Sequence, residues 1–270
     1  MELLEHLNFV PVYPVIGYAL AGAALIGVPC TLKAMVCGGG TFVTKLATFH
    51  GLAVSLGLAA LTLQKGNSLF AWHVIGMSFA IIGLQPAALQ SILSKNSYTD
   101  VETRKARVMN HKLLQMAVAM AVGGGFAAIY LNKPAGFPGK HFMSVHSLVG
   151  LAAMGMMSWN FLDAAYRQGN PIKPKLLWVS WLHRSTGTVA FVLSLSAVML
   201  GLFNRTAVVD WEARPITFSL PKGWNEMGGW AKSTHGSGLA WGFIMQTFLL
   251  LMMLLFHGPV KKVAETKKKS

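Results

Sequence analysis

Residues 67–82 read NSLFAWHVIGMSFAII, an apolar stretch that is long enough to begin a membrane-spanning helix. It nevertheless carries a histidine, His73, near its start. Ionisable residues inside membrane helices are costly, and they usually have a partner and a function. The stretch therefore predicts a membrane helix with a functional polar group, and the partners of His73 should identify its chemistry.

The composition also indicates a membrane protein. The 270 residues are 53% apolar and only 12% charged, which is about half the charged content of an average soluble domain. The net charge is +14, but Lys and Arg lie in short clusters between long apolar runs, as in membrane loops. Nucleic-acid binding is therefore not expected. The two cysteines, Cys30 and Cys37, lack metal-ligand spacing and are interpreted as free thiols.

Apolar segments of about 20 residues, the length that crosses a bilayer, predict the fold class. It is an all-α integral membrane helical bundle, with a six-helix core and an extra N-terminal transmembrane helix. The first segment is interpreted as retained rather than as a signal peptide, because Glu2 and Glu5 precede it and no basic residue does. The segments lie at approximately 11–30, 45–63, 69–93, 108–131, 142–165, 177–203 and 236–257.

The predicted organisation has three parts: an N-terminal extension (1–43), the core (44–257) with a long Trp-rich loop at 204–235, and a basic tail (258–270). Loops on one side of the membrane hold seven Lys and Arg residues, and the other side holds the remaining sixteen. The second side, with the C-terminus, is therefore expected to be cytoplasmic or its organellar equivalent. The tail is interpreted as an anchor near anionic lipid. An endomembrane of the endoplasmic reticulum type is expected, with an organellar membrane as the alternative.

Four consecutive apolar segments each carry a histidine near the start, at spacings of 38, 35 and 37 residues. Successive helices run in opposite directions, so one pair is expected near the outer face and the other near the cytoplasmic face. Two histidines at one depth can bind one haem iron axially, so four predict two stacked haems with irons roughly 20 Å apart. The alternative is that each histidine is a packing residue. The outer pair is His73 and His146, and the cytoplasmic pair is His111 and His183.

Glycines follow three of these histidines by three or four residues: Gly76, Gly150 and Gly187. Residues at this spacing share a helix face, and a missing side chain would leave room for a porphyrin. The alternative is the packing of small residues between membrane helices.

The segments GNSLFAWHVIGMS (66–78), RKARVMNHKLLQ (104–115), HFMSVHSLVGL (141–151) and LHRSTGTVAFVLSLSAVMLGL (182–202) together resemble the cytochrome b561 family of transmembrane reductases. They are most similar to the branch called cytochrome b561 domain-containing proteins. The resemblance covers about residues 44–256. It implies two b-type haems with bis-histidine ligation, His73 with His146 and His111 with His183. It also implies electron transfer from cytoplasmic ascorbate to monodehydroascorbate or ferric iron.

The chain departs from the family pattern in several places. Val74 stands where relatives often have proline, Pro86 lies inside the same helix, and the extra helix and the loop 204–235 are additions. These additions leave an alternative open: a haem-bearing or structural subunit of a larger respiratory or organellar membrane complex. Residues 11–30 and 204–235 would then contact its partners. A homodimer is expected only by analogy with relatives.

Beyond the haem ligands, no catalytic residue is expected, but charged groups near each haem are candidates for substrate binding. On the cytoplasmic side, family members use basic residues just before the third helix's histidine for ascorbate, although loop anchoring predicts the same charges. On the outer side, His141 is a candidate to pass a proton when a radical anion is reduced. The alternative is a loop histidine with no role. The cytoplasmic candidates are Arg104, Lys105, Arg107, Lys112 and Arg184, the last also for a haem propionate; the outer ones are Lys140 and His141.

Overall fold

The computed structural model describes residues 12–37, 41–64, 68–93, 101–132, 145–169, 181–203, 242, 245–250 and 252. In this part of the chain every regular element is a helix. Several expectations lie outside the described residues: those on Lys140 and His141, on the loop 204–235 and on the tail 258–270.

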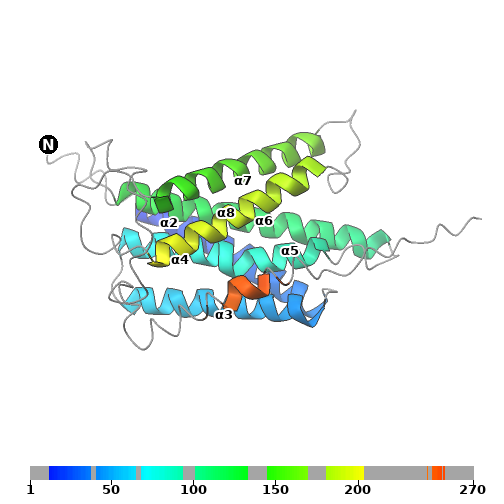
Figure 1. Ribbon diagram of the computed structural model, residues 1–270, viewed down its shortest axis with the longest axis horizontal. Helices are drawn as coiled ribbons and strands as arrows, with labels where there is room; N and C mark the ends of the chain where they lie inside the picture. Colours follow the sequence, from blue (N-terminus) through cyan, green and yellow to red (C-terminus); the bar gives the residue numbers. More distant parts are fainter. Residues whose placement is uncertain are drawn as a thin grey trace, which may run out of the picture. The chain divides into compact units, whose positions relative to one another are not determined.

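The helices follow the predicted segments closely (Figure 1). Among the described residues, six stretches are long and apolar enough to cross a membrane, and they correspond to the first six predicted segments. Most of the seventh predicted segment, 236–257, lies outside the described residues. The all-α membrane bundle with an extra N-terminal helix is thereby confirmed. The elements are α2 (Val12–Val36), α3 (Phe42–Gln64), α4 (Leu69–Ser78), the π-helical η1 (Phe79–Leu84), α5 (Gln85–Leu93), α6 (Val101–Leu131), α7 (Val145–Gly169) and α8 (Trp181–Phe203).

One predicted boundary is wrong by two turns. Helix α6 begins at Val101 rather than near residue 108, so Arg104, Lys105 and Arg107 lie on the helix itself. The polar stretch before the apolar segment is helical because it lacks glycine and proline, and Glu102 suits the first turn of a helix. Lys105 also forms an ion pair with Glu102 at 2.9 Å, one turn apart.

The crossing that contains His73 is built from α4, η1 and α5. It begins at Ser68, whose hydroxyl accepts a hydrogen bond from the Ala71 N–H and so caps the helix. Pro86 lies inside the crossing and has no N–H to donate to the Ile82 carbonyl. The turn before Pro86 is widened to a π-helix, in which the Gln85 N–H donates to the Ala80 carbonyl. Pro86 is therefore accommodated without ending the crossing.

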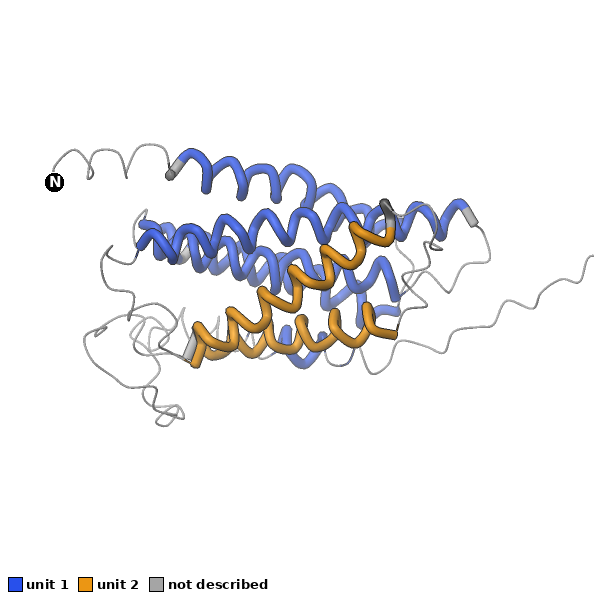
Figure 2. The backbone as a smooth tube through the Cα atoms, turned by 90° about the horizontal axis from the view of Figure 1, so that it is seen from above, with its two compact units in different colours: residues 1–132, 242–270 blue, residues 133–241 orange. Residues whose placement is uncertain are grey.

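The described helices fall into two compact units (Figure 2). Unit 1 comprises residues 1–132 and 242–270 and contains α2 to α6, with α6 packed against α2, α4 and α5. Its core is formed by small and branched apolar side chains, among them Leu84, Leu114 and Val118, which are fully buried. Unit 2 comprises residues 133–241, in which α7 and α8 pack against each other.

Candidate functional site

His73 is held against α6 by its ring nitrogen Nδ1, which lies 3.0 Å from the carbonyl oxygen of Gly125. A carbonyl only accepts hydrogen bonds, so Nδ1 carries the proton, and Nε2 is the acceptor atom of the neutral ring. Two glycines allow this approach. A Cβ on Gly76 would lie 2.8 Å from the Ala121 carbonyl oxygen and 2.9 Å from Gly125 Cα. Gly76 thus brings the backbones of α4 and α6 together beside His73.

His111, on α6, has the same arrangement with a different neighbour. Its Nδ1 lies 2.9 Å from the carbonyl oxygen of Ala88 in α5. The same reasoning makes Nδ1 the donor and Nε2 the acceptor. The His111 ring is half-buried, as is that of His73.

The contacts along α6 place the two histidines of unit 1 at different levels. His73 bonds to Gly125, and His111 lies fourteen residues before Gly125 in the same helix. At 1.5 Å per residue this separation is about 21 Å along the helix axis. Unit 1 therefore carries two histidines with the same tautomer, separated by most of the thickness of a bilayer core.

His146, in the first turn of α7, is held against α8. Its Nδ1 lies 2.7 Å from the Ala197 carbonyl oxygen, which again makes Nε2 the acceptor. Gly201, one turn beyond Ala197, makes room for the ring: a Cβ there would lie 2.8 Å from His146 Cε1 and 3.1 Å from Nδ1. No local sequence pattern links Gly201 to a histidine on another helix, so this contact is visible only in the tertiary structure.

His183 lies in the first turn of α8 and is half-buried. It precedes Ala197, the partner of His146, by fourteen residues, which again corresponds to about 21 Å along the helix. Near it, the Thr186 hydroxyl lies 2.9 Å from Oδ1 of Asn160 in α7. Asn160 was missed as well, although an amide inside an apolar helix is a usable signal.

The other two candidate glycines lie in unit 2 and differ from each other. A Cβ on Gly187 would lie 2.8 Å from Asn160 Nδ2, so the Asn160 side chain would have to shift to make room for it. A Cβ on Gly150 would only touch Ala197 Cβ at 3.9 Å, an ordinary contact. Each predicted pair of haem ligands combines one histidine from unit 1 with one from unit 2. The pairing and the contacts of the glycines with a porphyrin therefore stay predictions.

The basic residues around His111 have different environments. Arg107 is only 6% exposed, and its Nη2 donates to the Cys37 carbonyl oxygen, just past the end of α2, at 3.0 Å. Lys105 is exposed and paired with Glu102. Arg104 and Lys112 are half-buried, and Arg184 is exposed. Arg107 therefore holds the end of α2. Its burial and this bond distinguish Arg107 from the more exposed basic candidates.

Comparison with known proteins identifies the family. The family described as eukaryotic cytochrome b561 matches residues 72–208, about half of the chain, including all four histidines. The transmembrane reductase CYB561D2 of Mus musculus is 30% identical over 172 residues, covering 59% of this chain and 75% of the relative. The Homo sapiens protein of that name is 30% identical over 170 residues, covering 58% and 74%. Among solved structures, none matches the chain. Six apolar helices lie among the described residues, and the chain is a multi-pass membrane protein that belongs to the cytochrome b561 family.

Proposed function

We propose that this protein is a two-haem b-type cytochrome that carries electrons across the membrane from cytoplasmic ascorbate to monodehydroascorbate or ferric iron. Membership of the family supports transmembrane electron transfer and a b-type haem. In the proposal, His73 and His146 bind the outer haem, and His111 and His183 bind the cytoplasmic one.

The proposal rests on one observation, the equal spacing of the histidines in the two units. In α6, the carbonyl that binds His73 lies fourteen residues from His111; in α8, the carbonyl that binds His146 lies fourteen residues from His183. Two haems with mixed ligand pairs need two histidines at each of two levels. Equal separations of about 21 Å within each unit are compatible with this arrangement, whereas packing histidines have no reason to share one spacing.

The donor atoms also suit haem iron. Histidines that bind a metal usually donate their other ring N–H to a carbonyl or carboxylate, which fixes the tautomer and the orientation of the ring. His73, His111 and His146 each make this bond to a backbone carbonyl. Haem iron, when bound, exchanges one electron between its ferric and ferrous forms. The chain supplies axial nitrogens, a fixed ring orientation and an apolar surrounding.

The charged residues support an anionic donor on the cytoplasmic side. Ascorbate is an anion at neutral pH, and the exposed cations Lys105 and Arg184 and the half-buried Lys112 can attract it electrostatically. Arg104, also half-buried, is suited to directional hydrogen bonds. On the outer side, Lys140 would attract the acceptor, and His141 would deliver a proton as the radical is reduced. The relatives are named transmembrane reductases, which supports a reductase activity for this protein.

A pyridine haemochrome assay with an optical redox titration tests the proposal on protein purified in detergent. Two haems b per chain, rapidly reduced by ascorbate, are expected. His73→Ala and His111→Ala should each remove one of two distinct midpoint potentials. His50→Ala is the matched control, since His50 lies in α3 and bonds through Nδ1 to Gln246 Oε1 at 2.7 Å, yet is not a proposed ligand. Absence of haem, or loss of haem in the His50 variant alone, would contradict the ligand assignment.

A second function remains open, that of a subunit in a larger membrane complex. Helix α2 buries Ile16, Leu20 and Ala23 within unit 1 but exposes Val15, Tyr18 and Leu25. Lipid or a partner protein can cover that exposed apolar face. Blue native electrophoresis of mildly solubilised membranes separates the two functions, because a free-standing reductase migrates as a monomer or homodimer and a subunit migrates with larger partners. The same fractions, after organelle separation, test the endomembrane assignment.

A further inference from the structure

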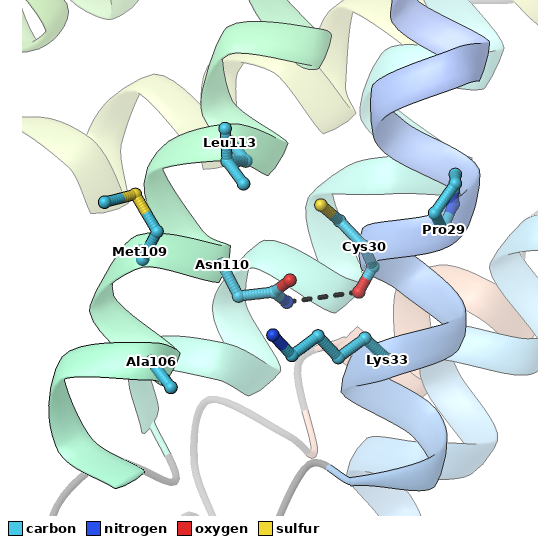
Figure 3. Close-up of a pocket in the computed structure, with 7 residues that line it drawn as sticks. All are labelled: Pro29, Cys30, Lys33, Ala106, Met109, Asn110 and Leu113. Atoms are coloured by element: carbon cyan, nitrogen blue, oxygen red, sulfur yellow. Dashed lines mark hydrogen bonds between the residues drawn. The ribbon is translucent and has the colours of Figure 1, made fainter. Parts of the chain in front are cut away.

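A pocket of about 200 Å³ lies between the extra helix α2 and α6 (Figure 3). Most of its wall is apolar, and three groups in it are polar or polarisable: Cys30, Lys33 and Asn110. Pro29, Met109 and Leu113 form part of the apolar wall. The pocket belongs to a helix that the family core does not include, so the haem site does not account for it.

Asn110 presents a hydrogen-bond acceptor to this pocket. It is only 5% exposed, and its Nδ2 donates to the Cys30 carbonyl oxygen at 3.1 Å and to Ser91 Oγ at 2.9 Å. The Ser91 hydroxyl donates to Ala87, so it accepts from Asn110. Both amide hydrogens are therefore used, and the orientation of the amide is determined. The oxygen Oδ1 is the remaining polar atom of a buried side chain that lines the pocket.

Lys33 supplies a positive charge at the same place. It lies in the last turn of α2, and Figure 3 shows its ammonium end pointing across the pocket toward α6. Neither of the two ion pairs among the described residues involves Lys33. The membrane-spanning stretch ends at Val36, so Lys33 lies at head-group depth, where a lysine extends its ammonium toward the membrane surface.

The wall around these groups is held in place by side chains of the core. Gln90 Nε2 donates to the Ala34 carbonyl oxygen at 2.9 Å, one turn beyond Cys30 on α2. Gln90 in turn accepts a bond from the Thr48 hydroxyl at 2.8 Å. With the bond from Asn110 to the Cys30 carbonyl, these contacts join α2 to α5 and α6. The pocket is therefore a built feature of unit 1.

We propose that this pocket binds one anionic phospholipid whose head group carries hydroxyls, such as a phosphatidylglycerol. Lys33 pairs with the phosphate, and Asn110 Oδ1 accepts a head-group hydroxyl. The first methylenes of an acyl chain lie against Met109 and Leu113. Basic pockets between membrane helices on the positively charged side bind such head groups. The bound lipid stabilises the contact between the extra helix and the core.

Thermal unfolding and native mass spectrometry of the purified chain test this proposal, with phosphatidylglycerol and phosphatidylcholine added at equal concentration. Phosphatidylglycerol is expected to raise the apparent Tm and to leave one lipid bound per chain. Phosphatidylcholine is expected to have neither effect. Lys33→Gln should weaken phosphatidylglycerol binding about tenfold through loss of one charge-assisted bond. Lys45→Gln is the matched control, because Lys45 is an exposed basic residue near the start of α3 that does not line the pocket.

Each alternative result has a defined meaning. Equal stabilisation by the two lipids, or wild-type binding by Lys33→Gln, would overturn the proposal. Inorganic phosphate or ascorbate alone reproducing the full effect would show a site for a free anion and would overturn the lipid assignment. Met109 is exposed, so Met109→Trp should fill the pocket without disturbing the core. This variant should lose lipid retention but keep the wild-type Tm in phosphatidylcholine, which distinguishes a lost site from a folding defect.

Discussion

Gly201→Ala gives the sharpest test of how His146 is positioned. Gly201 faces the His146 ring from α8, one turn beyond the carbonyl that binds Nδ1. Carbon atoms in contact prefer separations of about 3.5 to 4.0 Å, and the new Cβ would lie 2.8 Å from Cε1. The ring must therefore move by about 0.7 Å, which disturbs its 2.7 Å bond to the Ala197 carbonyl.

The energetic terms of this substitution oppose each other. Overpacking a well-filled site costs roughly 1 to 3 kcal/mol, whereas replacing glycine by alanine inside a helix gains roughly 0.5 to 1 kcal/mol. We expect a net loss of roughly 0 to 2.5 kcal/mol in unfolding free energy. We also expect altered ligand geometry at one haem only, because His146 is proposed to bind only the outer haem.

Electron paramagnetic resonance of the oxidised protein and a redox titration measure this change directly. One low-spin haem signal and one midpoint potential should shift, while the other pair of values stays at the wild-type level. Gly155→Ala in α7 is the control, because a Cβ there meets nothing within 4 Å; its signals should be unchanged and its stability equal or higher. Wild-type signals for both haems in Gly201→Ala would refute the reasoning, whatever the change in Tm.

Three further predictions concern unit 1. Gly76→Ala should lower the apparent Tm and disturb the haem that His73 is proposed to bind, measured optically, because its Cβ would meet backbone atoms of α6 that cannot move aside. Gln246→Leu should cost about 1 to 3 kcal/mol in unfolding free energy, since the fully buried amide bonds to His50 and to the Ala47 carbonyl; no loss on thermal unfolding would argue against that network. Lys105→Gln should raise the KM for ascorbate at unchanged Tm, whereas Arg107→Gln should lower the Tm by freeing the end of α2. Equal effects of the last two substitutions on the KM would contradict the separate roles.

Much of this architecture could be predicted from local pattern. Each membrane helix is specified by its own apolar residues, because a spanning helix satisfies all its backbone hydrogen bonds internally. The extra helix is therefore apparent despite Pro29, and the crossing Leu69–Leu93 despite Pro86, while Pro14 lies in the first turn of α2, where a helix tolerates proline. The start of α6 was missed because hydropathy does not register a polar helical turn beyond the membrane, where helix propensity decides.

The sequence by itself determined the class of protein, the order of its helices and the four histidines, since length, apolarity and spacing along one chain carry that information. Only the tertiary structure decided what each side chain contacts. Arg107, a candidate substrate residue by sequence, also bonds to the end of α2, and the contacts of Gly201 and Asn160 are visible only where α7 and α8 meet. The tautomer of His73 depends on a carbonyl fifty-two residues away. Contacts between helices arise from packing across the chain, and a pattern along one helix does not contain them.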